Sequence, residues 1–242
     1  MKIASKTDTG RVRETNQDSY AAGELSAGVA WAVVCDGMGG ANGGNIASAT
    51  AVKIISEYIA SSYREGMSSN SIKMMLESAV HSANMSIYDM SRTVESLSGM
   101  GTTVVVTLVS NSKAHIVHAG DSRAYKISGD VIIQITRDHS IVQSMVESGQ
   151  LSEDEAKSHP RKNVITRALG VDENIEIEYN EVDLGSSDSL MLCTDGLTNY
   201  LDVEEIKQTI KNHSFYEYPE VLVNKANAKG GRDNITVVVI KE

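Results

Sequence analysis

The most constraining feature of this sequence is an apolar run that ends at an aspartate and is followed by glycines. Residues Ala30 to Cys35 are almost wholly apolar, rich in valine, and include the only tryptophan, so they predict a buried β-strand. Asp36 follows, and then Gly37, Gly39 and Gly40. Glycines allow a sharp turn and the close approach of a carbonyl to a ligand. The stretch indicates an acidic group presented at the end of a sheet, although Asp-Gly is also a common turn signal.

Composition limits the classes of protein to which this chain can belong. Its 242 residues can bury a substantial core, and apolar and charged fractions of 41% and 22% are those of an ordinary globular protein. No apolar run approaches the ~18 residues that span a bilayer, and the start lacks a secretion signal, so we expect a cytoplasmic protein without membrane insertion. The net charge of -10 argues against non-specific nucleic-acid binding.

The first half of the chain changes from helical to strand-like patterns. Residues 45–63 and 71–97 carry apolar side chains at helical spacing and predict two long helices. β-branched runs separated by turns follow, and they predict one antiparallel meander. The runs of this meander cover residues 102–109, 114–119, 123–127 and 131–135.

The second half predicts short helices and further strands. Residues 141–147 and a segment opened by Ser152 favour helices, Asp202 with Glu205 three residues later resembles a capping box, and Pro219 suits a first helical turn. Strands are expected at residues 2–6, 175–182, 189–194 and 235–240. Because most strands can pair as hairpins, the pattern favours an α+β protein in which two sheets pack face to face with helices outside.

Four aspartates stand beside expected strand ends, and three of them adjoin glycine. They are Asp36, Asp121, Asp195 and Asp233. If they converge at one rim of a sheet pair, their mutual repulsion requires a positive partner. An all-oxygen group suits Mg²⁺ or Mn²⁺, and two such ions form a clamp for hydrolysis at phosphorus. Spacing alone leaves this hypothesis beside a simpler one, a scatter of turn aspartates.

Seven motifs then occur in the order expected for a known family. The chain resembles the metal-dependent protein phosphatases (PPM family) of the protein phosphatase 2C type, particularly the short bacterial members, over essentially its whole length. The motifs are Arg13-x-x-Asn16-Gln17-Asp18, Asp36-Gly37-Met38-Gly39-Gly40, Gly101-Thr102-Thr103, Gly120-Asp121-Ser122-Arg123, Asp138-His139-Ser140, Thr194-Asp195-Gly196-Leu197 and Gly231-Arg232-Asp233-Asn234-Ile235-Thr236.

The resemblance implies a fold, a domain and a reaction. The fold is an αββα four-layer sandwich, in which helices flank two antiparallel sheets. Residues 1–242 form one catalytic domain, with a flap segment at about residues 140–163. The implied activity is hydrolysis of phosphoserine and phosphothreonine by direct attack of a metal-bridging water or hydroxide, without a phosphoenzyme.

The resemblance also implies the residues that hold metal. Asp36 bridges two Mn²⁺ or Mg²⁺ ions, the Gly37 carbonyl binds one of them, and Asp195 and Asp233 complete the ligands of the other. These carboxylates are the implied catalytic residues.

Three further roles follow from the same resemblance. Asp18 acts on the metals through water, and Asp121 helps to hold a weaker third ion. Arg13 grips the substrate phosphate, a role that suits its planar fork of donors.

Two positions depart from the pattern of eukaryotic relatives. Met38 stands where many of them have a histidine proposed as the general acid, and a thioether has no proton to give. His139 is the tempting substitute, but we favour a structural role for it. Gln17 replaces a glutamate and removes one negative charge near the metals.

The resemblance leaves three functional classes. The leading one is a monomeric phosphatase acting on phosphoproteins, namely a cognate Ser/Thr kinase and its substrates. The second is a phosphatase dedicated to one regulatory phosphoprotein, such as an anti-sigma-factor antagonist. The third is a non-catalytic phosphoprotein-binding module, which the retention of Asp36, Asp195 and Asp233 disfavours.

Overall fold

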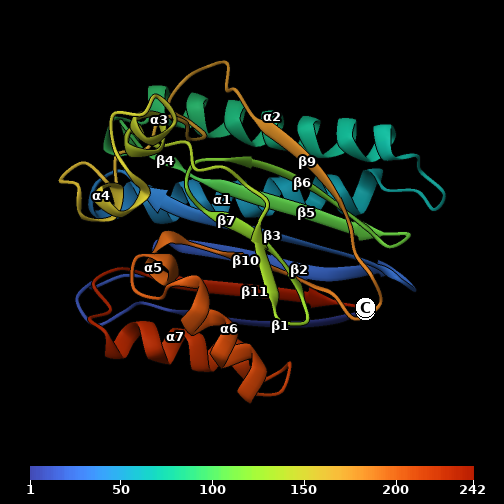
Figure 1. Ribbon diagram of the computed structural model, residues 1–242. Coiled ribbons are helices and arrows are strands. Elements are labelled where there is room, and N and C mark those ends of the chain that lie inside the picture. The colour runs from blue at the N-terminus through green and yellow to red at the C-terminus, as the bar shows by residue number, and fades with distance from the viewer.

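Two antiparallel sheets lie face to face between two layers of helices (Figure 1). The computed structural model describes the backbone of residues 1–242 and all side chains except those of residues 41 and 42. One sheet has the strand order β1-β11-β10-β7-β8, and the other has the order β2-β3-β5-β6-β9, with β4 paired to β3. The expected α+β class and the αββα sandwich are therefore confirmed.

The bounds of the elements follow in the order of their layers. The first sheet contains β1 (Lys2–Asp8), β7 (Arg123–Ser128), β8 (Val131–Gln134), β10 (Ser189–Cys193) and β11 (Ile235–Lys241). The second contains β2 (Asp18–Ser26), β3 (Val29–Met38), β4 (Gly101–Thr102), β5 (Val104–Ser110), β6 (Lys113–Ala119) and β9 (Glu178–Asp183). The helices are α1 (Gly40–Ser62), α2 (Ser69–Thr93), α3 (Ile141–Glu147), α4 (Glu153–Ser158), α5 (Asp195–Thr198), α6 (Val203–Asn212) and α7 (Tyr218–Ala228).

Three apolar clusters hold the layers together. One lies under α1 and α2 and includes Ile55, Leu76 and Val106, all with no exposed surface. A second lies under α6 and α7 on the far side of the other sheet. The third fills the space between the sheets and includes Val34 from one sheet and Leu192 from the other. This arrangement leaves the ends of the sheets as the place where polar side chains can gather.

Several expected elements are confirmed. The two long helices are α1 and α2, and α6 begins with a capping box formed by Asp202 and Glu205. Ser152 opens α4 with a second capping box, and Pro219 lies in the first turn of α7. The expected edge strand at the N-terminus is β1, which pairs only with β11 in its sheet order.

The expected single meander over residues 102–135 is wrong. The chain forms two hairpins, β5–β6 in one sheet and β7–β8 in the other, and it crosses between the sheets at Gly120 and Asp121. Gly120 has a φ of 110°, a conformation that favours glycine. β6 is buried along nearly its whole length, so its apolar pattern does not reveal which sheet the next strand joins.

The strand that was expected to stop before Asp36 continues through Asp36 to Met38. Its last residues pair with β4, where Gly37 lies opposite Thr102. The segment Asp18–Ser26 forms β2, which the sequence did not indicate, because Ala, Gly and Glu have low strand propensity. Asp36 is thus held inside a paired strand and not in a loose turn.

The segment between β8 and β9 contains α3 and α4, and its two ends are joined by backbone hydrogen bonds. Ser140 and Ile165 form an isolated bridge, and the Ile141 amide donates to the Val164 carbonyl over 2.9 Å. α3, α4 and α5 lie together at one end of the molecule (Figure 1). Among the described residues, no helix combines the length and apolar character needed to cross a membrane.

Helix α1 approaches the end of β3 through two glycines. A Cβ atom on Gly44 would lie 2.7 Å from the carbonyl carbon and oxygen of Gly37, and a Cβ on Gly37 would lie 2.0 Å from the Gly44 carbonyl oxygen. Real Cβ contacts of this length do not occur, so both positions require glycine for steric reasons. The contact fixes the start of α1 beside Asp36.

We expect Gly44→Ala to destabilise the protein by about 2 kcal/mol, because the new methyl group forces the two backbones apart. Helix propensity alone predicts the opposite sign, a gain of about 0.5–1 kcal/mol. Thermal unfolding of the two proteins distinguishes these outcomes, and a raised Tm in the variant would contradict the steric account.

Candidate active site

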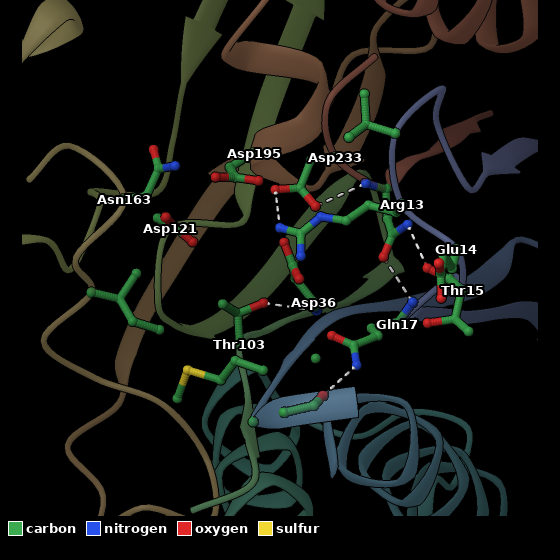
Figure 2. A pocket seen from close by; sticks show the side chains of 17 residues that line it. Arg13, Glu14, Thr15, Gln17, Asp36, Thr103, Asp121, Asn163, Asp195 and Asp233 are labelled. Atoms are coloured by element: carbon green, nitrogen blue, oxygen red, sulfur yellow. Dashed lines mark hydrogen bonds and ion pairs between the residues drawn. The ribbon is translucent and has the colours of Figure 1, made fainter. Parts of the chain in front are cut away.

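A cavity of about 600 Å³ opens at the end of the sheets. Segments distant in sequence line it, and Figure 2 shows Asp36, Asp121, Asp195 and Asp233 directed into it together with Arg13. The four aspartates identified in the sequence are therefore gathered at one place, and the alternative of scattered turn aspartates does not hold.

Each of these aspartates comes from a different part of the chain, at or near the end of a strand. Asp36 lies near the end of β3, Asp121 in the crossing from β6 to β7, Asp195 at the first residue of α5 directly after β10, and Asp233 just before β11. The sheet pair thus supplies a rigid frame on which carboxylates separated by up to 197 residues converge. Gly37 also lines the cavity.

Asp18 lies behind the cavity and does not line it. Its side chain is 7% exposed, and Oδ2 accepts hydrogen bonds from Thr194 Oγ1 (2.9 Å) and Thr236 Oγ1 (2.7 Å). Burial raises its pKa to about 7, and the two hydroxyl donors oppose that rise. The position agrees with an indirect role behind the cavity-lining carboxylates.

The carboxyl groups in the cavity are buried close to one another, and their negative charges repel. Burial raises the pKa of Asp36 well above its ordinary value, and the negative charges of Asp18 and Asp195 add to the effect. Burial and the charge of Asp195 raise the pKa of Asp121 to about 8, and burial with Asp233 raises that of Asp195 to about 6. Such a cluster gains stability from any cation that binds among its oxygens.

The donor atoms fit a hard divalent cation. Oδ1 of Asp18 and Oδ1 of Asp195 are buried and have no hydrogen-bond partner. An unpartnered buried carboxylate oxygen is costly unless a cation or a water completes its surroundings. The set is all oxygen, as Mn²⁺ and Mg²⁺ prefer, because both buried cysteines lie outside the cavity lining.

Arg13 reaches the carboxylates from the loop between β1 and β2. Its Nη2 donates to Asp233 Oδ2 over 2.9 Å, and half of its side chain is exposed to the cavity and solvent. That hydrogen bond raises the pKa of Arg13, so the guanidinium is a permanent charge at the cavity wall. The remaining donors suit a phosphate.

Asn234 and Thr103 are positioning residues to which the sequence reasoning gave no role. Asn234 Oδ1 accepts from the Gln17 amide (2.8 Å), and its Nδ2 donates to the carbonyls of Thr9 and Thr15, so one buried side chain anchors both ends of the loop that carries Arg13. Thr103 Oγ1 accepts from the Asp36 amide over 2.9 Å. Both residues stand inside quoted motifs, which was the available signal.

The two departures in the sequence have definite places. Met38 and Gln17 line the cavity, and Gln17 Nε2 donates to the Gly40 carbonyl over 3.0 Å.

His139 is 7% exposed and lies outside the cavity lining, with Nδ1 accepting from the Gly120 amide over 3.2 Å. Burial and the positive charges of His118 and Arg167 lower its pKa to about 4, although Glu178 opposes this shift. This position is compatible with the structural role that we favour for His139.

We expect Mn²⁺ to stabilise the protein more strongly as pH rises. Carboxyl groups with a raised pKa bind more protons in the folded protein than in the unfolded chain. When a chelator removes metal, the fold therefore loses stability as the pH rises from the ordinary Asp pKa of 3.8 to about 8. Mn²⁺ favours their ionised form and cancels this loss. At pH 8, excess Mn²⁺ should raise Tm by about 5–10 °C, and at pH 5 by much less. A gain that does not change with pH would contradict the assignment of these carboxylates.

Comparison with known proteins places this architecture and site in one family. The model of the family described as protein phosphatase 2C matches residues 9–235. The serine/threonine phosphatase stp of Listeria innocua is 36% identical over 245 residues, which cover 100% of this chain and 96% of that protein. The protein phosphatase PhpP of Streptococcus pneumoniae is 36% identical over 99% of this chain and 97% of its own length.

Solved structures agree. The serine/threonine phosphatase PstP/Ppp of Mycobacterium tuberculosis superposes with a TM-score of 0.90 at 31% identity, over 100% of this chain and 99% of that one. A PstP catalytic domain in complex with two manganese ions gives a TM-score of 0.86 at 30% identity, over 98% and 96% of the two chains. The chain belongs to the protein phosphatase 2C family of metal-dependent protein serine/threonine phosphatases.

Proposed function

We propose that this chain hydrolyses phosphoserine and phosphothreonine in phosphoproteins with two Mn²⁺ or Mg²⁺ ions held by Asp36, the Gly37 carbonyl, Asp195 and Asp233. The observation that carries this proposal is the convergence of four carboxylates and one arginine on a single cavity. When bound, the two ions supply an activated water and neutralise charge at phosphorus. Residues 1–242 act as a single catalytic domain.

The carboxylates divide into three roles. Asp36, whose backbone amide donates to Thr103, would hold both ions. Asp121, at the far wall, contributes to a third and weaker site. Asp18 lies behind the residues that line the cavity. Because Thr194 and Thr236 already donate hydrogen bonds to its Oδ2, Asp18 would act on the metals through water.

Arg13 binds and orients the substrate phosphate. Its contact with Asp233 holds the guanidinium beside the proposed metal ligands, so a phosphate between them meets positive charge on both sides. The cavity of about 600 Å³ has space for a phosphorylated side chain with part of its peptide. Position and charge together supply the main catalytic effect for phosphoryl transfer to water.

The proton for the departing alkoxide comes from water in the cavity. Met38 lines the cavity but carries no proton, and His139 lies outside it with its ring held by Gly120. This assignment distinguishes the chain from relatives that have histidine at the position of Met38.

The partners we propose are phosphoproteins, namely a cognate Ser/Thr kinase and the substrates of that kinase, met by a monomeric enzyme. The family membership supports phosphoprotein substrates in general. Among the described residues that line the cavity, none favours a single dedicated substrate over several, and the presence of all the proposed ligand carboxylates disfavours a non-catalytic module.

We expect Asp36→Asn to abolish Mn²⁺-dependent hydrolysis of a phosphothreonine peptide, as chelator should in the parent protein. Loss of a bridging charge removes several kcal/mol of stabilisation, so kcat/KM should fall at least about a hundredfold. Asp130→Asn, at an exposed turn outside the cavity, is the matched control and should retain activity. Turnover that survives both chelator and Asp36→Asn would refute the metal mechanism.

Arg13→Gln should raise KM for the same peptide about 10- to 100-fold, the effect of losing a charge-assisted hydrogen bond to phosphate of about 1.5–3 kcal/mol. Steady-state kinetics measure this change. Arg11→Gln, which removes a neighbouring exposed arginine outside the cavity lining, should leave KM nearly unchanged. Equal effects of the two substitutions would assign the change to general charge and not to phosphate binding.

A further inference from the structure

The segment of residues 140–163, called the flap here, includes a lysine that is linked to the site by hydrogen bonds. Lys162 Nζ donates to Asn199 Oδ1 over 3.2 Å. Asn199 Nδ2 in turn donates to Asp195 Oδ2 over 2.9 Å. Two hydrogen bonds therefore join the flap to a carboxylate that we assign as a metal ligand.

The short helix α5 places Asn199 next to Asp195. Asp195 and Asn199 are four residues apart, and the Asn199 amide also donates to the Asp195 carbonyl over 2.8 Å. Because Asn199 engages Oδ2, the other oxygen of Asp195, Oδ1, stays buried and unpartnered. The amide of Asn199 is oriented by its two neighbours, with its oxygen toward the ammonium group and its nitrogen toward the carboxylate.

The charge of Lys162 acts on Asp195. The positive charge of Lys162 lowers the pKa of Asp195 and so favours the ionised carboxylate. Its effect is smaller than the effects of burial, Asp233, Asn199 and Arg123. Lys162 is half-buried at the end of the flap, next to Asn163, which lines the cavity. An ammonium group therefore stands close to a site that must accept divalent cations.

Given the assignment of Asp195 as a metal ligand in the proposed function, we propose that Lys162 is a positioning residue that couples flap docking to cation binding, with the two events opposing each other. Lys162 and a cation compete for the negative charge of Asp195. A dication beside Asp195 repels the ammonium group, which weakens the contact of the flap with Asn199. Since coupling is reciprocal, the docked Lys162 must lower the cation affinity by the same factor.

The test is Mn²⁺ binding to the full chain by titration calorimetry. Lys162→Gln should lower the Kd for Mn²⁺ roughly two- to fivefold, the effect of removing a screened unit charge several ångströms from a dication. Lys162→Arg keeps the charge and should restore the parent Kd. Lys157→Gln, which removes an exposed flap lysine paired with Asp154, is the matched control and should leave the Kd unchanged.

Amide hydrogen exchange of residues 153–163 gives a second readout. In the parent protein, Mn²⁺ should speed exchange in the flap, whereas in Lys162→Gln the exchange should already be fast and independent of Mn²⁺. A structural defect would weaken Mn²⁺ binding, so the sign of the change in Kd separates it from the proposed competition.

Two results would overturn the proposal, and two others would overturn the metal assignment on which it rests. Lys162→Gln could bind Mn²⁺ no more tightly than the parent, or Mn²⁺ could slow flap exchange equally in both proteins; either result refutes the coupling and leaves the metal assignment standing. If the parent protein does not bind Mn²⁺, or if Asp36→Asn binds it equally well, the metal assignment itself fails.

Discussion

The repulsion among carboxylates at one end of the sheet pair is the constraint on which the rest of the structure depends. Asp36, Asp121, Asp195 and Asp233 line one cavity, and Asp18 lies behind them. Such a group is unfavourable in itself, as the raised pKa values of several members indicate. The apolar clusters on both sides of the sheets supply the stability that holds these charges together.

The scaffold holds the group through contacts of the backbone as well as through packing. Thr103 accepts a hydrogen bond from the Asp36 amide, and the Thr194 and Thr236 hydroxyls donate hydrogen bonds to Asp18. Asn234 fixes the loop that brings Arg13 to Asp233. The proposed binding of cations, the proposed binding of phosphate and the position of the flap therefore involve the same few side chains, which is why we expect a charge on the flap to affect metal affinity.

Much of this arrangement could be predicted from the sequence, and the reasons for the rest are physical. Asp36 and Asp195 follow apolar runs in the sequence and precede glycine, which is a local signal. The crossing between sheets at Gly120 left no such signal, since β6 is buried whichever sheet follows it. The contact of Lys162 with Asn199 joins residues 37 apart, and the position of the flap in space is needed to find it.

The most direct measurement is a crystal structure of the chain grown with Mn²⁺, with anomalous scattering recorded at the manganese edge. We expect two peaks about 3.5–4 Å apart within the cavity, with Asp36 touching both. Asp195 and Asp233 should bind one of these ions. Peaks outside the cavity, or a cavity without manganese at saturating concentration, would contradict the claim that this carboxylate group exists to hold two divalent cations.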